Sequence, residues 1–315
     1  MHYIGVDLGG TKIAAGIVNS KGKIIKEVKM QINKSKPSDE IVNSIIKTIH
    51  MVLDHSNVKI KNIKCIGVGC PGTPDKDRKI IVYNNNLSFN NVQIKKLIQK
   101  EFNVPVVIDN DANCVALAEN WIGVAKKIKN CVVITLGTGI GCGIIIDKEI
   151  YRGFNGAASE MGHMVIKTNG IKCSCGRKGC WERYASTNAL INIAKRLSRK
   201  NPESLINRLS GNDAKIVNGK IVFDAAKLGD KTANEAISKF IFFLGVGIVN
   251  LINILQPEML VIGGGISGEG DYLLNPIKKF VDGKTYGEGR IKATKIECAK
   301  LGNKAGIIGA AMLGK

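Results

Sequence analysis

A pattern of short strands that occurs twice constrains the fold of this chain more than any other feature. Apolar and β-branched residues fill 3–7 and 13–19, a Gly-Gly turn separates them, and a third strand-like run covers 23–32. Short alternating runs joined by glycine turns predict an antiparallel meander. A second series of the same kind covers residues 131–136, 143–147 and 149–152.

Helical spacing follows the first meander. Ile41, Ile45 and Ile49 lie four residues apart and predict a helix over 38–54 with Ser38 as its cap. A meander followed twice by alternating helices and strands predicts a duplicated α/β architecture with a cleft between the halves. The other expected helices are 92–102, 112–121, 233–255, 272–280 and one from 305, and the other expected strands are 63–69, 104–109, 259–262 and 292–301.

The charge of the chain raises the question of nucleic-acid binding, because the formal net charge is +20. Eight of the 46 basic residues are arginine, and the lysines are scattered along the chain. No block alternates aromatic with positive residues, as a base-stacking surface does. We therefore expect a lysine-rich solvated surface and no nucleic-acid partner.

The apolar stretches predict a buried helix and no membrane partner. The longest, 240–255, is shorter than the roughly 20 residues that a membrane span needs, and Asn250 and Asn253 interrupt it. The N-terminus enters a strand directly, with no apolar leader before it. Nine cysteines without such a leader indicate the reducing cytoplasm, where clustered cysteines bind metal more often than they form disulfides.

Two glycine-rich turns join neighbouring strands, one in each meander. Neither matches the Walker pattern or the dinucleotide fingerprint. Each turn alone can be a plain hairpin, but a backbone without Cβ atoms approaches an anion closely, and two such turns with threonine hydroxyls favour a clamp on ATP phosphates. The candidate phosphate ligands are Gly9, Gly10, Thr11 and Lys12 in the first turn and Thr138, Gly139 and Gly141 in the second.

Two further features bear on the nucleotide. Asp7 stands beside the first turn, and an acid next to phosphates requires a cation between them, which suggests Mg²⁺ and so Mg-ATP. Gly264 and Gly265 follow the expected strand 259–262 and would let a flat adenine lie against the backbone.

The tightest cysteine cluster is His163 with Cys173, Cys175 and Cys180. One imidazole and three thiolates are the ligand set of a closed tetrahedral structural Zn²⁺ site. Unbound thiols are the alternative to a metal site. Redox chemistry ranks third, because the Cys-x-Cys spacing differs from the CxxC redox motif. The ion would hold a loop with little core of its own and, with it, the nearby Glu160 and Glu182.

The run Asp109–Asn113 ends an expected strand and opens an expected helix. Helix capping accounts for one polar residue there, and it is the plain interpretation of each residue taken alone. Four polar residues exceed that need. Carboxylates and carboxamides suit sugar hydroxyls, and one carboxylate would have to accept the proton of the attacking hydroxyl.

With these motifs in place, the chain resembles the ROK family of sugar kinases, and within it the bacterial-type glucokinases. The resemblance covers nearly the whole length, and the combination of ExGH with the CxCGxxGCxE segment is highly specific. Asp109 stands where the family often has Glu, and Phe89 where Trp is common. The matching motifs are DLGGTK at 7–12, GCPGTPD at 69–75, NNNL at 84–87, DNDAN at 109–113, LGTGIGCG at 136–143, ExGH at 160–163, CSCGRKGCWE at 173–182 and GGGI at 263–266.

The resemblance implies duplicated actin-like ATPase (ribonuclease H-like) domains with a hinged central cleft. The small domain is expected over 1–108, completed by the C-terminal helix 304–315, and the large domain with the zinc loop over 109–303. The implied activity is the Mg-ATP-dependent phosphorylation of glucose to glucose 6-phosphate in the cytoplasm, by a homodimer or homotetramer.

The resemblance also implies roles for single residues. Asp111 matches the catalytic base. The matching sugar ligands are Asn110, Glu160, His163 and Glu182, with Gly72 and Asn86 lining the same pocket, and the zinc ligands are His163, Cys173, Cys175 and Cys180.

Two alternatives stay open at this point. The first is a ROK kinase for N-acetylmannosamine, fructose or glucosamine, because pocket shape sets specificity at the 2-position. The second, from another functional class, is a sugar-responsive transcriptional repressor. Such repressors carry an N-terminal DNA-binding domain, whereas the first strand here begins by Tyr3.

Overall fold

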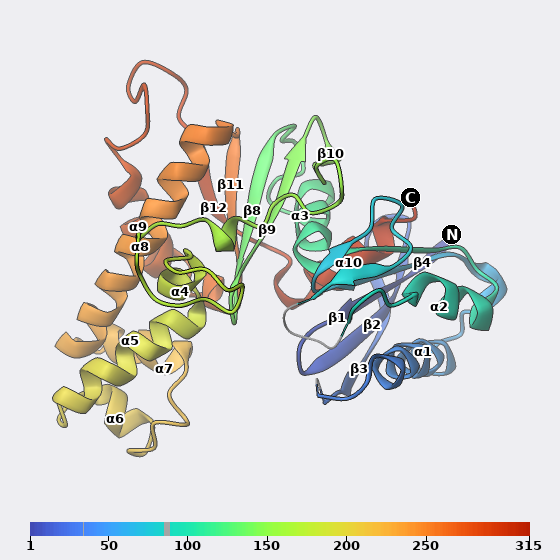
Figure 1. The fold of residues 1–315 in the computed structure, drawn as a ribbon, viewed down its shortest axis with the longest axis horizontal. Helices are drawn as coiled ribbons and strands as arrows, with labels where there is room; N and C mark the ends of the chain where they lie inside the picture. The colour runs from blue at the N-terminus through green and yellow to red at the C-terminus, as the bar shows by residue number, and fades with distance from the viewer. Residues whose placement is uncertain (34, 85–88) are drawn as a thin grey trace. The chain divides into compact units, whose positions relative to one another are not determined.

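The computed structural model describes residues 1–33, 35–84 and 89–315, drawn as a ribbon in Figure 1. The chain divides into two compact units. Unit 1 comprises Met1–Val133, Cys142–Ser159 and Lys300–Lys315, and unit 2 comprises Ile134–Gly141 and Glu160–Ala299. Unit 1 thus includes residues 109–133, 142–159 and 300–303, which were expected in the large domain.

The first sheet has the strand order β3-β2-β1-β4-β7. Its first three strands form the expected antiparallel meander, and β4 and β7 extend the sheet in parallel with β1. The register places Asp7, Gly69 and Asp109 in one row across three neighbouring strands. The strands are β1 (His2–Leu8), β2 (Lys12–Asn19), β3 (Ile24–Gln31), β4 (Ile63–Cys70) and β7 (Val106–Asn110).

Alternation along β1 separates the two faces of this sheet. Ile4, Val6 and Leu8 belong to one buried cluster with the apolar face of α1 (Ser38–Asp54), while Tyr3 belongs to another with α10 (Ala305–Met312). Helices therefore cover both faces of the sheet. Successive side chains of a strand point to opposite faces, and both sets are apolar here, so both faces must be buried. The last helix of the chain packs against the first strand.

The close approach of α10 explains two glycines in the middle of the strands. A Cβ built on Gly5 would collide with the backbone oxygen of Ile307, and one on Gly67 with that of Ala310. Larger residues at either position would push the helix off the sheet, because backbone atoms cannot rotate away as a side chain can.

Residues at the amino ends of α1 and α3 (Asp111–Trp121) determine where these helices of unit 1 begin. Ser38 is the first helical residue of α1 rather than its cap, because Pro37 holds the cap position without a side-chain hydrogen bond. Asn110 caps α3 through its own side chain. The remaining elements of unit 1 are η1 (Ile60–Asn62), β5 (Thr73–Pro74), β6 (Ile81–Tyr83), α2 (Ile94–Phe102) and η4 (Gly302–Lys304).

The second sheet has the order β10-β9-β8-β11-β12, which repeats the order of the first: a meander, then two strands beyond its first strand. This repetition confirms the expected duplicated α/β fold. Two strands of this sheet are shorter than expected: one covers 149–150 rather than 149–152, and the other covers 295–298 rather than 292–301. The strands are β8 (Cys131–Leu136), β9 (Ile140–Ile146), β10 (Glu149–Ile150), β11 (Met259–Gly264) and β12 (Lys295–Cys298).

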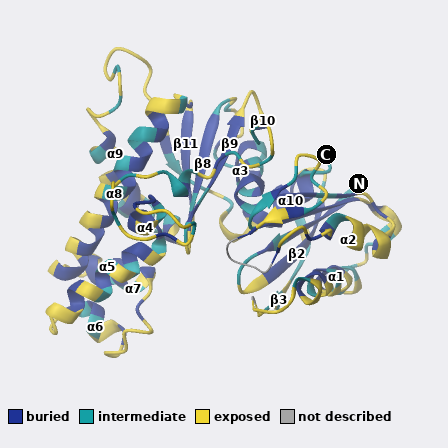
Figure 2. Ribbon diagram, viewed as in Figure 1, coloured by how far each residue is buried: buried dark blue, intermediate teal, exposed yellow. Residues whose placement is uncertain are grey.

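Unit 2 is mostly helical outside the sheet. Its longest helix, α8 (Lys231–Leu255), begins two residues earlier than expected, where Asp230 accepts a hydrogen bond from the Ala233 N–H at 2.6 Å. By length and composition alone α8 could cross a membrane, but one face of it is buried against neighbouring helices, as the dark blue stretches in Figure 2 show. The other elements are η2 (Met161–His163), α4 (Glu182–Ala185), α5 (Thr187–Lys200), α6 (Leu205–Leu209), α7 (Gly219–Lys227), η3 (Gly265–Glu269) and α9 (Asp271–Val281).

Candidate functional site

Asp7 occupies the carboxyl end of β1, at the start of the first glycine turn. Its carboxyl group lies so close to Gly306, in the first turn of α10, that a Cβ on that glycine would be 2.5 Å from Asp7 Cγ. Burial raises the pKa of Asp7 to about 6, and the Lys12 ammonium partly offsets the rise. The amino end of α10 favours the ionised form, and a cation beside the carboxylate would do so more strongly.

The first glycine turn closes tightly and leaves its tip accessible. The Gly9 N–H donates to the Lys12 carbonyl at 2.9 Å. Thr11 and Lys12 are exposed, and a Cβ on Gly10 would meet no described atom within 4 Å. The candidate phosphate ligands of this turn therefore share an open loop that follows Asp7 directly.

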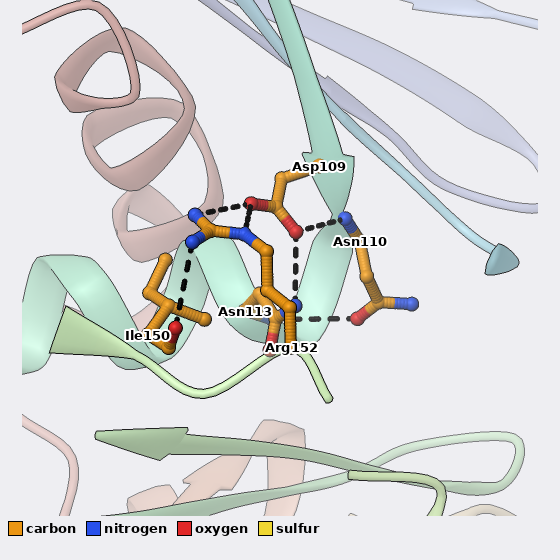
Figure 3. Close-up of polar contacts among 5 residues, drawn as sticks. All are labelled: Asp109, Asn110, Asn113, Ile150 and Arg152. Carbon is orange, nitrogen blue, oxygen red and sulfur yellow. Dashed lines mark hydrogen bonds and ion pairs between the residues drawn. The ribbon is translucent and has the colours of Figure 1, made fainter. Parts of the chain in front are cut away.

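Asp109 and Asn110 end β7, and Asp111 opens α3. Figure 3 shows the polar contacts of Asp109 and Asn110. The Asn110 Oδ1 accepts from the N–H groups of Ala112 at 2.8 Å and Asn113 at 3.3 Å, which is the capping role. Its Nδ2 donates to the Gly72 carbonyl at 3.0 Å, so two of the residues predicted for the sugar site are hydrogen-bonded to each other. Nδ2 keeps a second hydrogen for another acceptor.

Asp109 is fully buried, and it pairs with a residue that the sequence analysis missed. Arg152 places Nη2 at 2.7 Å and Nε at 2.8 Å from Asp109 Oδ2. The Asn113 amide and the Asn110 N–H donate to the other oxygen at 2.9 and 2.8 Å. Asp109 is thus a structural ion-pair residue rather than part of an accessible carboxylate set.

A sequence signal for Arg152 exists but is faint. A buried Asp that ends a strand needs a cation, and arginine is the residue best suited to a bidentate pair. The two residues stand 43 positions apart, so spacing alone could not have joined them.

Asp111 is the first residue of α3, and the Ala112 N–H donates to its Oδ1 at 2.9 Å. The side chain is only partly buried, unlike Asp109 two residues earlier. Gly72, whose carbonyl accepts from the Asn110 side chain, has a φ of 102°, which favours glycine. Asn86, the other predicted pocket residue, lies outside the described residues.

The second glycine turn joins β8 to β9 in unit 2. The Gly137 N–H donates to the Gly139 carbonyl at 3.0 Å, and Gly137 and Thr138 are exposed. Gly141 is partly buried at the start of β9. The turn presents its backbone and the Thr138 hydroxyl to an approaching ligand.

Gly264 is predicted to lie under an adenine, but packing of the backbone already explains why this position is glycine. Its φ is 94°, and a Cβ there would collide with the backbone of Leu136. Gly265 faces open space among the described residues. The end of β11 therefore carries no side chain at these two positions, which a flat ring against the backbone would require.

The structure brings together the four predicted zinc ligands. The ligand atoms of His163, Cys173, Cys175 and Cys180 all lie within 4.8 Å of one another. The Cys173 Sγ is 3.6 Å from His163 Nδ1, and the Cys175 and Cys180 Sγ atoms are 3.5 Å apart. A tetrahedral zinc site with the usual bond lengths has ligand–ligand distances of about 3.5–3.8 Å. The donor set fits the ion in chemistry, and these two distances fit it in spacing.

Burial raises the pKa of the Cys173 thiol to about 12, and the hydrogen bond to Glu182 contributes to the rise. The Cys173 Sγ donates to Glu182 Oε1 at 3.1 Å, and His163 Nδ1 lies 4.0 Å from the same oxygen. Glu182 therefore lies directly against the cysteine cluster.

Glu160 and His163 flank the η2 turn, where the His163 N–H donates to the Glu160 carbonyl at 3.0 Å. Burial raises the pKa of Glu160; the nearby His163 lowers it and Glu182 raises it further. The three residues predicted to bind sugar in unit 2 are thus close enough to influence one another.

Trp181 anchors the segment that carries Glu182. It is fully buried, and its Nε1 donates to the Phe243 carbonyl of α8 at 2.9 Å. The neighbouring Tyr184 hydroxyl accepts from the Ile171 N–H at 2.6 Å, which ties the cysteine loop to α4. A core residue on each side holds Glu182 at the amino end of this short helix.

Comparison with known proteins identifies relatives over the whole chain. The profile of the ROK family matches residues 3–315. A glucokinase of Halalkalibacterium halodurans is 36% identical over 99% of this chain and 94% of its own length. A xylose repressor of Caldicellulosiruptor bescii is 32% identical over 97% of this chain and 76% of its own. The crystal structure of a Streptomyces griseus ROK glucokinase in complex with glucose and AMPPNP superposes with a TM-score of 0.90, at 33% identity and 99% coverage of both chains.

Proposed function

Because the chain belongs to the ROK family, we propose that it is a hexose kinase that uses Mg-ATP to phosphorylate glucose to glucose 6-phosphate. The observation that carries the proposal is similarity along the full length: glucokinases from three genera are 33–36% identical over 99% of this chain. The Streptomyces griseus glucokinase that was solved in complex with glucose and AMPPNP has a closely similar fold.

In this proposal the residues of unit 1 activate the attacking hydroxyl. Asp111 accepts the proton of the sugar hydroxyl as its oxygen attacks the γ-phosphoryl group. Its place at the first position of α3, beside the Asn110 cap, holds the carboxylate in one orientation. Asn110 donates its remaining amide hydrogen to the sugar. Asp7 would hold Mg²⁺, which neutralises phosphate charge.

The residues of unit 2 bind the sugar ring and the phosphates. Glu160 and Glu182 accept hydrogen bonds from ring hydroxyls, and each carboxylate can accept two. His163 uses Nδ1 toward the cysteines, which leaves Nε2 for a hydroxyl. The backbone of the turn at Thr138, Gly139 and Gly141 lies close to phosphate oxygens, as the open turn allows.

A structural Zn²⁺ on His163, Cys173, Cys175 and Cys180 belongs to the proposal. Supporting it are the ligand–ligand distances of 3.5 and 3.6 Å, and a loop whose regular structure is limited to isolated bridges such as Lys172 with Lys178. The ion would supply a cross-link within this loop, on which the Cys173 contact of Glu182 depends.

We further propose a cytoplasmic homo-oligomer, either a dimer or a tetramer. Phe242 and Ile254 of α8 are 52% and 66% exposed, and a groove of about 760 Å³ between α8 and α9 includes Phe242 and Phe280. Exposed apolar side chains of this size favour a protein partner. Light scattering after gel filtration would test the assembly: one mass equal to the monomer would refute it.

The experiment that tests the function is a substrate panel with ADP release as the readout. Glucose, N-acetylmannosamine, fructose and glucosamine are offered in turn, each with Mg-ATP and then with polyphosphate as donor. We expect the highest kcat/KM for glucose with ATP. Preference for another hexose would replace the substrate and keep the kinase, whereas release of ADP with none of them would overturn the kinase.

A repressor is the second candidate, because a xylose repressor covers 97% of this chain. The same purified protein is mixed with genomic fragments at physiological salt and examined by gel shift. Retarded DNA that xylose or glucose releases would favour the repressor, and no shift together with glucose-dependent ADP release would favour the kinase.

A further inference from the structure

The turn that joins β8 to β9 is in contact with the segment that carries the sugar-binding acids. The Thr187 N–H donates to the Gly137 carbonyl at 3.0 Å, and the Thr187 hydroxyl donates to the Leu136 carbonyl at 3.1 Å. On the other side of the turn, a Cβ on Gly162 would collide with the Ile140 carbonyl oxygen. Both sugar-binding segments therefore rest on the backbone of the phosphate turn.

Gly139 makes the closest of these contacts. A Cβ built on it would collide with Oε2 of Glu182 and lie 3.4 Å from Cδ, and no other described atom beyond its chain neighbours is within 4 Å. The opposite oxygen, Oε1, accepts from Cys173 at 3.1 Å. The Glu182 carboxylate is thus held between the cysteine cluster on one side and the bare backbone of Gly139 on the other.

Gly137, two residues earlier in the same turn, has a different environment. A Cβ there would meet no described atom within 4 Å. Neither glycine has a φ in the left-handed region, so backbone conformation does not require glycine at either position. The open side at Gly137 suits an approaching phosphate, whereas the lack of a side chain at Gly139 makes room for Glu182.

We propose that Gly139 is a positioning residue for the sugar: the absence of a side chain at this position sets where the Glu182 carboxylate lies, so the phosphate turn determines sugar affinity even without nucleotide. The inference rests on the proposed function, because it assumes that Glu182 binds the sugar. A methyl group on Gly139 must displace the carboxylate, since the atom it meets is the far end of a side chain and can rotate. A displaced carboxylate no longer accepts hydroxyl protons at the right distance and angle.

The first test is Gly139→Ala, with Gly137→Ala as the matched control in the same turn. Calorimetry measures the glucose Kd without nucleotide and the ADP Kd without sugar. We expect Gly139→Ala to weaken glucose binding by roughly tenfold or more, the size of one lost hydrogen bond to a charged group. Gly137→Ala should weaken ADP binding and leave the nucleotide-free glucose Kd unchanged. Equal glucose affinity in the wild type and Gly139→Ala would overturn the inference.

A double-mutant cycle with Glu182→Ala identifies the route of the effect. If Gly139 acts through Glu182, adding Gly139→Ala to Glu182→Ala changes the glucose Kd no further. Additive losses would mean that Gly139 acts in another way, and the inference would fail. If Glu182→Ala alone binds glucose as the wild type does, the sugar site of the proposed function is wrong, which is a different failure.

Folding and metal content are followed in parallel. We expect melting temperature and zinc content of Gly139→Ala to match the wild type, because the collision involves one rotatable side chain. If the variant melts too early for binding to be measured, the double variant with Glu182→Ala removes the collision and should restore the melting temperature. Failure to restore it would overturn the inference.

Discussion

Two groups of acids in this protein are held in place by different means. In unit 1, Asp109 is buried with Arg152 at 2.7 Å, and helix capping by Asn110 orients the next residue, Asp111. In unit 2, Glu182 lies between the cysteine cluster and a glycine turn, on a short helix of four residues. The first group depends on packing within a sheet and its helices, whereas the second lies beside a loop in which one histidine and three cysteines cluster.

The two groups should therefore tolerate different changes. A group held by packing should lose stability when a partner is removed, because an unpaired buried charge remains. A group beside such a loop should lose ligand affinity first, because the loop has little core of its own. Each of the following experiments tests one side of that contrast.

The largest expected effect comes from Asp111→Ala. Loss of the general base should lower kcat by about 10²–10⁴-fold, while the glucose Kd changes little, because Asp111 acts on one proton and the other sugar ligands remain. Asp111→Asn keeps the shape and the acceptor for the Ala112 N–H, so it serves as the control for α3 itself. Turnover near the wild-type rate in Asp111→Ala would show that another group is the base.

Next in size is Arg152→Met, which leaves Asp109 buried without its cation. We expect the free energy of unfolding to fall by about 3 kcal/mol, measured by urea denaturation. Lys79→Met is the matched control, because its pair with Asp77 is 62% exposed on both sides and exposed pairs contribute little to stability. A similar loss in both variants would contradict the assignment of Asp109 to a structural ion pair.

Asp7→Asn should separate stability from activity. The folded protein holds the pKa of Asp7 at about 6, above the ordinary value of 3.8. The native state therefore binds this proton more tightly than the unfolded state, and stability falls as the pH rises from about 4 to about 6. The variant removes that loss, so at pH 7 it should be more stable by about 3 kcal/mol and yet lack kinase activity.

Two measurements check this prediction. The stability gain should vanish near pH 4, followed by thermal denaturation across the pH range. In the wild type, kcat/KM for Mg-ATP should decline below about pH 6 as Asp7 becomes protonated. A stability gain that persists at pH 4 would rule out ionisation of Asp7 as its cause.

The smallest expected effect is that of Cys175→Ser on sugar affinity. Loss of one ligand should remove the zinc ion and weaken glucose binding by roughly tenfold, because Glu182 loses the support of the loop. Cys298→Ser, outside the cluster and also partly buried, is the control. Zinc is measured by mass spectrometry and the glucose Kd by calorimetry. Unchanged glucose affinity in a metal-free Cys175→Ser would mean that packing alone holds Glu182.

Local chemistry made much of the site readable from the chain. The three cysteines fall within eight positions and the capping Asn110 adjoins its helix, so short-range spacing predicted both the cysteine cluster and the start of α3. The meanders were predictable for a similar reason, since strand alternation and glycine turns are properties of consecutive residues. Strand ends were less predictable: 292–301 shrank to 295–298, because pairing with β11 alone defines the strand.

Local spacing alone therefore predicted the repeated strand order, the clustering of His163 with three cysteines, and the glycine turns. The tertiary structure decided which polar residues are structural and which are accessible. It paired Asp109 with Arg152 across 43 positions and seated the Glu182 carboxylate on Gly139, also 43 positions away. The physical reason is that burial and contact depend on what the folded chain places nearby, which no local spacing records.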